Sequence, residues 1–67
     1  MEDKGLAICT DIYDSEGNML RIEAHNTNDE FIIQGLWDIR DEQTAENREA
    51  FRTWFYRQLR QQGYRTE

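Results

Sequence analysis

Two residues, Cys9 and His25, are of the types that together could support nucleophilic catalysis. A thiol nucleophile needs a base within hydrogen-bond reach. If the first two predicted strands pair across the loop that joins them, His25 falls opposite the beginning of the first strand rather than opposite Cys9. We therefore expect Cys9 to pack as a small apolar residue, and we expect a protein that is not an enzyme and has no catalytic residues.

Acidic residues raise two other kinds of chemistry, metal binding and acid–base catalysis. Glu23 and His25 share a strand face, but two ligands are too few for a metal site. The spacing of Asp11, Asp14 and Glu16 partly resembles that of a calcium-binding loop. The glycine and the closing glutamate that such a loop needs are not at the required positions. A pair of catalytic carboxylates also needs a desolvating cleft, for which 67 residues leave little room. We expect neither a metal nor a cofactor.

The elements that position these side chains begin with three strands, predicted at about residues 6–13, 19–25 and 30–37. The more apolar face of the first strand predicts that its core residues are Leu6, Ile8, Thr10 and Ile12. Alternation of apolar and polar residues in the second strand predicts that three side chains face the core: Leu20, Ile22 and Ala24. The third strand is apolar on both faces, and Gly35 within it would allow another element to approach closely.

A helix is predicted at about residues 44–62, with Thr44 as its N-cap and Gly63 as its terminator. Spacings of three and four residues form one apolar stripe, made of Phe51, Trp54, Phe55 and Leu59. This stripe is the only cover available for the sheet. The predicted fold is α+β, a three-stranded antiparallel meander packed against one C-terminal helix, in a single domain of residues 1–67 with frayed ends at 1–4 and 65–67.

Charge divides the chain into an acidic part and a basic part. The net charge is −6, with −9 in residues 1–46 and +3 in residues 47–67. Our main hypothesis is a small protein-interaction module whose acidic face binds the basic surface of a protein partner through Asp11, Asp14, Glu16, Glu23, Asp29 and Glu30. One alternative is nucleic-acid binding through the helix residues Arg48, Arg52, Tyr56, Arg57 and Arg60. Another is a structural subunit or homodimer, which the aromatic content of the third strand and helix favours.

The predicted layout resembles that of the arm-binding domain of tyrosine recombinases and of a family of plant DNA-binding domains. Those domains read DNA with a basic strand face, whereas the strands and loops here are acidic. A short, acidic, proline-free chain with one cysteine also resembles phage-encoded inhibitor proteins. That resemblance implies a viral protein that inhibits a host nucleic-acid-binding protein.

The expected location follows from the cysteine content and the apolar runs. One cysteine indicates a reducing compartment. The Met-Glu-Asp-Lys start is not typical of a signal peptide, and no apolar run reaches the length of a membrane span. We expect a cytoplasmic protein without membrane association, in the host cytoplasm for a phage-encoded chain.

Overall fold

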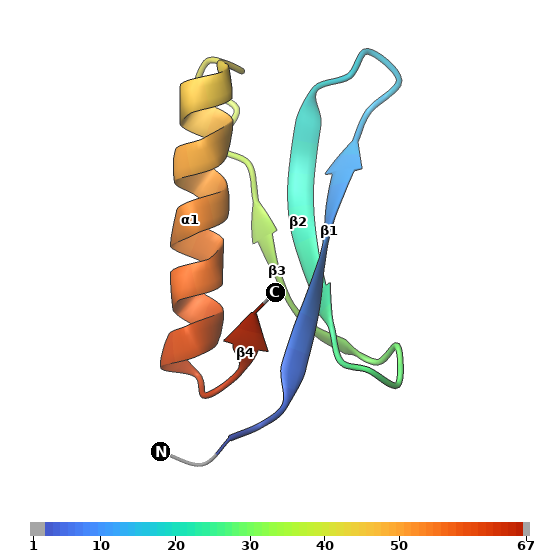
Figure 1. The fold of residues 1–67 in the computed structure, drawn as a ribbon. Helices are drawn as coiled ribbons and strands as arrows, with labels where there is room; N and C mark the ends of the chain where they lie inside the picture. Colours follow the sequence, from blue (N-terminus) through green and yellow to red (C-terminus); the bar gives the residue numbers. More distant parts are fainter. Residues whose placement is uncertain (1–2, 67) are drawn as a thin grey trace.

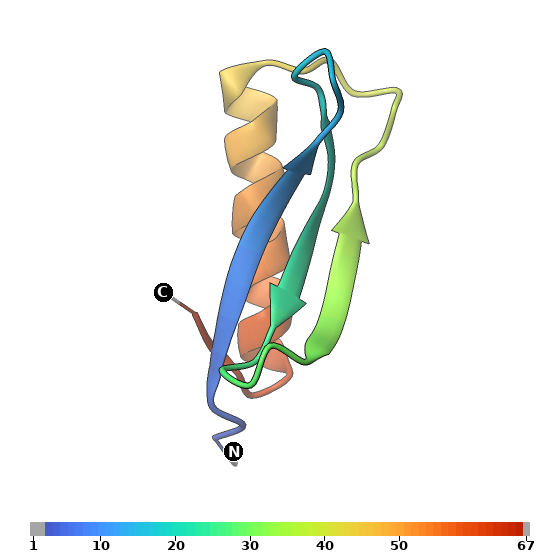
Figure 2. The same ribbon diagram turned by 90° about the vertical axis from the view of Figure 1, so that its right-hand side faces the viewer.

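The computed structural model describes residues 3–66 and shows a four-stranded mixed sheet with one helix packed on one of its faces (Figure 1). In chain order, the elements are β1 (Leu6–Tyr13), β2 (Met19–His25), β3 (Phe31–Leu36), α1 (Ala45–Gln61) and β4 (Arg65–Thr66). The strand order is β3-β2-β1-β4, so that β3 lies at the sheet edge opposite β4 (Figure 2). The α+β class and the three antiparallel strands are confirmed, but β4 joins β1 in parallel, so the sheet is not a simple meander.

Both ends of the described chain carry main-chain hydrogen bonds, while the fraying predicted for residues 1–4 and 65–67 stays a prediction. The Lys4 amide donates to the Gly63 carbonyl at 2.9 Å, and the Arg65 amide donates to the Gly5 carbonyl at 2.8 Å. The turn after α1 sends the chain back along β1, and β4 forms there. The other terminal residues for which fraying was predicted lie outside the described residues; they are Met1, Glu2 and Glu67.

The face of β1 that packs on the core is the opposite of the one we predicted. Ala7 is buried and Cys9 packs against the core, while Ile8 is 38% exposed. Cys9 pairs with Ala24, which is also buried, and paired residues of antiparallel strands share a face. The prediction failed because counting apolar residues favours large side chains, whereas the buried face here is built from small ones, Ala7 at 1% and Ala24 at 0% exposure.

A bulge in β2 causes a second difference. The pairing of β1 with β2 shifts register at Leu20, which is the extra residue. An extra residue interrupts the alternation of side chains, so Met19 takes the buried position and Leu20 is left 44% exposed. Ile22 and Ala24 face the core as predicted.

The helix ends are those that the sequence predicted. The Thr44 hydroxyl accepts a hydrogen bond from the Asn47 amide at 3.0 Å. Gly63 has a φ of +98°, and the Tyr64 amide donates to the Leu59 carbonyl at 3.1 Å. This is the Schellman arrangement, in which the helix stops at a left-handed residue.

The buried face of α1 is rotated relative to the predicted stripe. Phe55 and Leu59 are buried, but Trp54 is 47% exposed and Tyr56 packs against the core. Gly35 does allow a close approach, as predicted: a Cβ there would lie 2.8 Å from Phe55 Cδ1. No helix within residues 3–66 is long and apolar enough to cross a membrane.

Candidate functional site

The structure separates the acidic residues that we expected to form one binding face. Asp14 and Glu16 lie in the turn between β1 and β2, and Asp29 and Glu30 adjoin the turn between β2 and β3 at the opposite end of the strands (Figure 1). These two turns therefore cannot contact the same small region of a partner.

The other two acids of that set lie on opposite faces of the sheet. Glu23 is on the face away from α1, where it pairs with Arg21 at 2.7 Å. Asp11 is on the helix side and pairs with Arg52 of α1. The Asp11 carboxylate raises the pKa of Arg52. This pair joins helix to sheet, so Asp11 belongs to the packing of the fold and not to a continuous acidic face.

Asp14 holds its own turn together. Its Oδ1 accepts hydrogen bonds from the amides of Glu16 and Asn18, both at 2.9 Å. These bonds favour the ionised form and, with the Asn18 amide contributing most, lower the pKa of Asp14. The carboxylate is thus fixed at the end of the hairpin.

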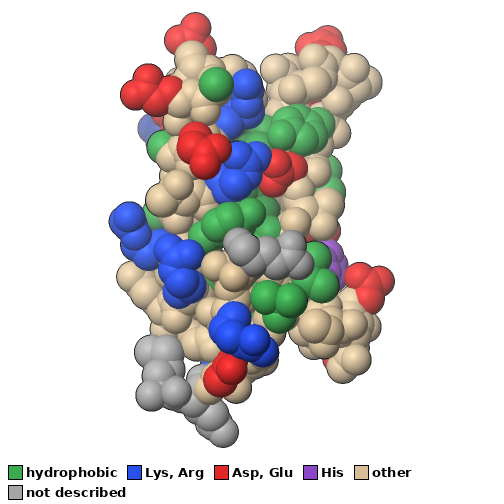
Figure 3. Space-filling view, viewed as in Figure 1, with side chains coloured by type: hydrophobic (Ala, Val, Ile, Leu, Met, Phe, Trp, Pro, Cys, Tyr) green, Lys and Arg blue, Asp and Glu red, His purple; other side chains and the backbone are tan. Residues whose placement is uncertain are grey.

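Most of the predicted basic helix residues have partners within the chain. Besides Asp11, Arg52 pairs with Glu49 at 3.0 Å. Arg60 donates to the Thr66 hydroxyl at 3.3 Å. Figure 3 shows basic side chains following the helix, with acidic ones among those of its upper part.

The remaining members of that set are divided between bonded and exposed positions. Arg48 donates to the Gln43 carbonyl, and Tyr56 is partly buried against the core. Arg57 is exposed. The sequence-predicted row Arg52, Tyr56 and Arg60 is therefore not a uniformly basic, solvated surface.

A third acidic segment, residues 38–42, is tethered beside the turn between β1 and β2. The side-chain amide of Gln43 bridges the main chain of Met19: Oε1 accepts from the Met19 amide at 3.1 Å, and Nε2 donates to the Met19 carbonyl at 3.0 Å. The Trp37 indole donates to the Asp41 carbonyl at 3.3 Å. Sequence reasoning missed Gln43, because no spacing or motif marks a glutamine that will bridge to a strand 24 residues earlier.

This tether creates what we call the acidic end, defined by Asp14, Glu16, Asp38, Asp41 and Glu42. Asp38 pairs with Arg40 at 2.7 Å, and the Arg40 side chain is the main cause that lowers the pKa of Asp38 to about 2. Five carboxylates and one guanidinium, that of Arg40, leave this end with a net charge of −4 at neutral pH.

An apolar slot opens within the acidic end. Its volume is about 290 Å³, and it is lined by Asp14, Asn18, Met19, Leu20, Trp37, Ile39, Asp41 and Gln43. Ile39 is 93% exposed, although its side chain is entirely apolar. The lining of the slot combines apolar side chains with two aspartates, Asp14 and Asp41. A lysine or arginine side chain has the matching form, an apolar stem with a cationic head.

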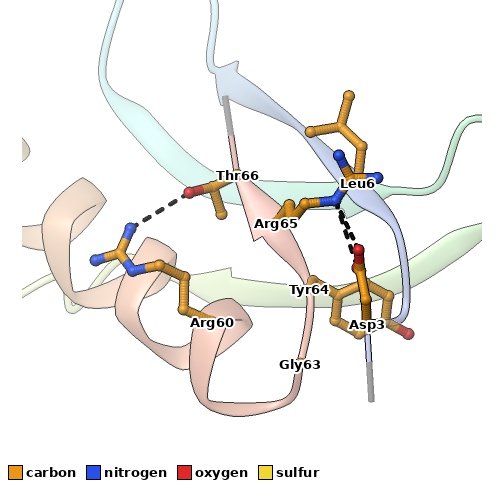
Figure 4. A pocket seen from close by; sticks show the side chains of 7 residues that line it. All are labelled: Asp3, Leu6, Arg60, Gly63, Tyr64, Arg65 and Thr66. Carbon is orange, nitrogen blue, oxygen red and sulfur yellow. Dashed lines mark hydrogen bonds and ion pairs between the residues drawn. The ribbon is translucent and has the colours of Figure 1, made fainter. Parts of the chain in front are cut away.

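A pocket larger than the slot lies at the other end of the molecule, between β4 and the start of β1 (Figure 4). It has a volume of about 580 Å³ and is lined by Asp3, Leu6, Arg60, Gly63, Tyr64, Arg65 and Thr66. Arg65 pairs with Asp3 at 3.1 Å, and Arg60 is bonded to Thr66. Each charged side chain of this pocket has a partner within the pocket, so these groups do not indicate a ligand.

Cys9 and His25 do not form a catalytic pair. His25 pairs with Ile8, and Cys9 pairs with Ala24, so the two side chains point to opposite faces of the sheet. The His25 ring instead packs edge-on against Phe31, with 5.8 Å between ring centroids. Among residues 3–66, the structure contains no group of three or more side chains that could hold a metal.

Comparison with protein-family models, with curated proteins and with solved structures gives no match for this chain. The acidic end and its slot are therefore the features from which a function can be inferred.

Proposed function

We propose that this chain is a small, non-enzymatic protein-interaction module whose acidic end binds a basic surface of a partner protein. The observation that carries the proposal is the slot, whose lining brings Leu20, Trp37 and Ile39 together with two aspartates, Asp14 and Asp41. An acidic patch alone could serve only solubility, whereas an apolar slot among fixed acids has a shape that suits one class of side chain.

The two parts of the slot contribute different things to binding. A partner lysine or arginine would place its stem against Leu20 and Ile39 and its charged head near Asp41. Covering a fully exposed isoleucine contributes roughly 1.5–3 kcal/mol. The net charge of the acidic end mainly raises the association rate and selects against acidic partners.

A nucleic-acid-binding protein is one class of partner with such a surface. The acidic end would then compete with phosphates for the partner's lysines and arginines. An inhibitor of a host protein, of the kind that phages encode, is one form of this function. Direct nucleic-acid binding has less support, because Arg52 is paired with two carboxylates of the same chain, Asp11 and Glu49.

The proposal can be tested with a short arginine-rich peptide as the probe. Trp37 lines the slot, so the NMR signal of its indole N–H should shift on titration, while that of Trp54 on the helix should not. Replacing Ile39 by Ser should weaken binding roughly tenfold or more, because it removes an apolar wall. The fold should be unaffected, since Ile39 is 93% exposed.

Matched charge variants separate the acidic end from general electrostatics. Neutralising Glu16, Asp41 and Glu42 as amides should weaken binding roughly 3- to 150-fold at low salt, at about 0.2–1 kcal/mol per charge. The control removes the same charge away from the acidic end and from the ends of β3, as amides of Asp3, Glu23 and Glu49. Equal losses in the two triple variants, or an Ile39→Ser protein that binds normally, would refute the proposal.

A further inference from the structure

The edge of the sheet formed by β3 differs from the rest of the sheet in its charge. Residues Phe31–Leu36 include no charged side chain, whereas β1, β2 and β4 each carry at least one. Proteins usually protect an edge strand with charges, prolines or a covering element, because its unpaired main-chain groups can pair with another strand. In the part of the chain that the structure describes, residues 3–66, β3 lies at the edge of the sheet and no further strand lies beside it (Figure 2).

The main-chain groups that this edge presents can be identified from its pairing with β2. The Trp37 amide donates to the Leu20 carbonyl at 3.0 Å. Alternate residues of a strand direct their main-chain groups to opposite sides. Trp37, Gly35 and Ile33 therefore face β2, and the N–H and C=O groups of Gln34 and Leu36 face the open edge.

Exposed apolar side chains lie on both sides of this edge. On the face away from α1, Phe31 is 57% exposed and Leu36 is 66% exposed. On the helix side, the 47% exposed Trp54 packs over Gly35, where its Cζ3 would lie 3.2 Å from an added Cβ. Trp54 is also stacked on Phe51, with 5.9 Å between ring centroids. A strand added here would find apolar cover above and below it.

The charges at the two ends of β3 indicate what kind of strand would be added. Asp29 and Glu30 precede it, and the loop 38–42 that follows carries three acids and Arg40, so each end has a net charge of −2. A second copy pairing antiparallel about Gln34 would bring Glu30 opposite Asp38 of the other copy at both ends. Like charges in opposite positions oppose pairing. A strand with basic residues at its ends meets attraction instead.

From these observations we infer that the β3 edge binds an extended segment of a partner protein by strand addition, and that this segment is apolar in its middle and basic at its ends. The inference rests on the proposed function, because it assigns a second contact to the same basic protein partner. Main-chain hydrogen bonds give such a contact its affinity, and the flanking side chains give it specificity. The edge is continuous with the acidic end, since Trp37 follows β3 directly and lines the slot.

Hydrogen exchange of the full-length chain tests the inference directly. The probe is a synthetic peptide of about nine residues, enough to span β3, with alternating Val and Thr between lysines at both ends. At a peptide concentration about tenfold above its Kd, the amides of Gln34 and Leu36 should exchange about tenfold more slowly, because they exchange only from the unbound protein. The amides of Gly35 and Trp37 should change little, since they are already bonded to β2.

Two matched peptides serve as controls while the protein stays unchanged. Replacing the lysines by glutamates should weaken binding roughly tenfold or more at low salt. N-methylation of the peptide residues that face β3 should abolish the protection, whereas N-methylation of the alternate residues should not. Unchanged exchange at Gln34 and Leu36 with the lysine peptide bound would overturn the inference.

The outcomes distinguish this inference from the proposed function. A shift of the Trp37 indole without protection at β3 overturns strand addition and leaves the acidic end as the binding site. Protection that is undiminished in the Ile39→Ser protein, which keeps every charge at the ends of β3, supports the edge and counts against the slot of the acidic end. Protection that appears without peptide and grows with protein concentration identifies a second copy as the occupant and overturns the inference of a basic partner.

Discussion

Replacing Gly35 by Ala tests how closely helix and sheet approach each other. The new Cβ would lie 2.8 Å from Phe55 Cδ1 and 3.2 Å from Trp54 Cζ3. A separation below 3.0 Å cannot be kept, so either the Phe55 ring or the strand must move. Phe55 is buried, with only 1% of its surface exposed, so its ring has little freedom to move away from the new Cβ.

Two effects of opposite sign set the magnitude. Overpacking a well-filled core costs about 1–3 kcal/mol. The φ of Gly35 is not in the left-handed region, so alanine can adopt the same backbone conformation. Alanine then stabilises the folded protein by about 0.4–1 kcal/mol, because it reduces the conformational entropy of the unfolded chain. The net expectation is a loss of roughly 0.5–2 kcal/mol in the free energy of unfolding. For a chain of this size that is a fall in Tm of roughly 4–8 °C per kcal/mol.

Urea unfolding followed by tryptophan fluorescence measures this loss. Gln34→Ala is the control, because it adds no atoms and lies on the exposed side of the same strand. In the double variant Gly35→Ala with Phe55→Leu, the cost of the alanine should shrink, because the ring it meets is gone. A Gly35→Ala protein more stable than wild type by about 0.5–1 kcal/mol would show only the effect on the unfolded chain and would refute the close approach.

Two further predictions concern single side chains. Thr44→Ala should destabilise by about 0.5–2 kcal/mol in urea unfolding, because it removes the bond to the Asn47 amide, while Thr44→Ser should retain most of the stability. The pKa of Asp38 is lowered to about 2 in the folded protein, against about 3.9 in the unfolded chain. The ionised carboxylate therefore stabilises the fold fully at pH values above about 3.9, and this stabilisation is lost as the pH falls through 2. The stability difference between wild type and Asp38→Asn should therefore be constant above about pH 5 and shrink towards pH 2; a difference that grows on acidification would contradict the pairing with Arg40.

The elements could be predicted because their signals are local. Alternation, the turn glycines, the Thr44 cap and the Gly63 stop each depend on a few neighbouring residues, and the strand and helix bounds agree with the structure within one residue. The faces could not be predicted in the same way. Which face of β1 is buried depends on α1, which packs against small side chains. Which way Met19 points depends on a bulge, and no residue type in the sequence indicates that bulge. β4 was missed because two residues have no periodicity.

The acidic residues could be counted from the sequence, but their grouping could not. Asp11 was assigned to a surface by its charge, and its partner Arg52 lies 41 residues away. The acidic end exists because one amide, that of Gln43, bridges the main chain of Met19 and holds residues 38–42 beside the hairpin. Long-range contacts of this kind carry no signature in a single sequence.

The acids at the two ends of β3 act on two competing processes at once. An uncharged edge strand flanked by exposed Phe31, Leu36 and Trp54 is a hazard for self-pairing. Carboxylates at both ends oppose that pairing, because a second copy brings the same sign of charge. The same carboxylates attract a basic strand, so a change that weakens them would favour self-association and disfavour the partner together. Salt acts in the same direction, since it screens both the repulsion and the attraction. Opposite responses of self-association and partner binding to salt are therefore the signature of an edge kept open for a basic strand, whereas a purely hydrophobic surface would show neither.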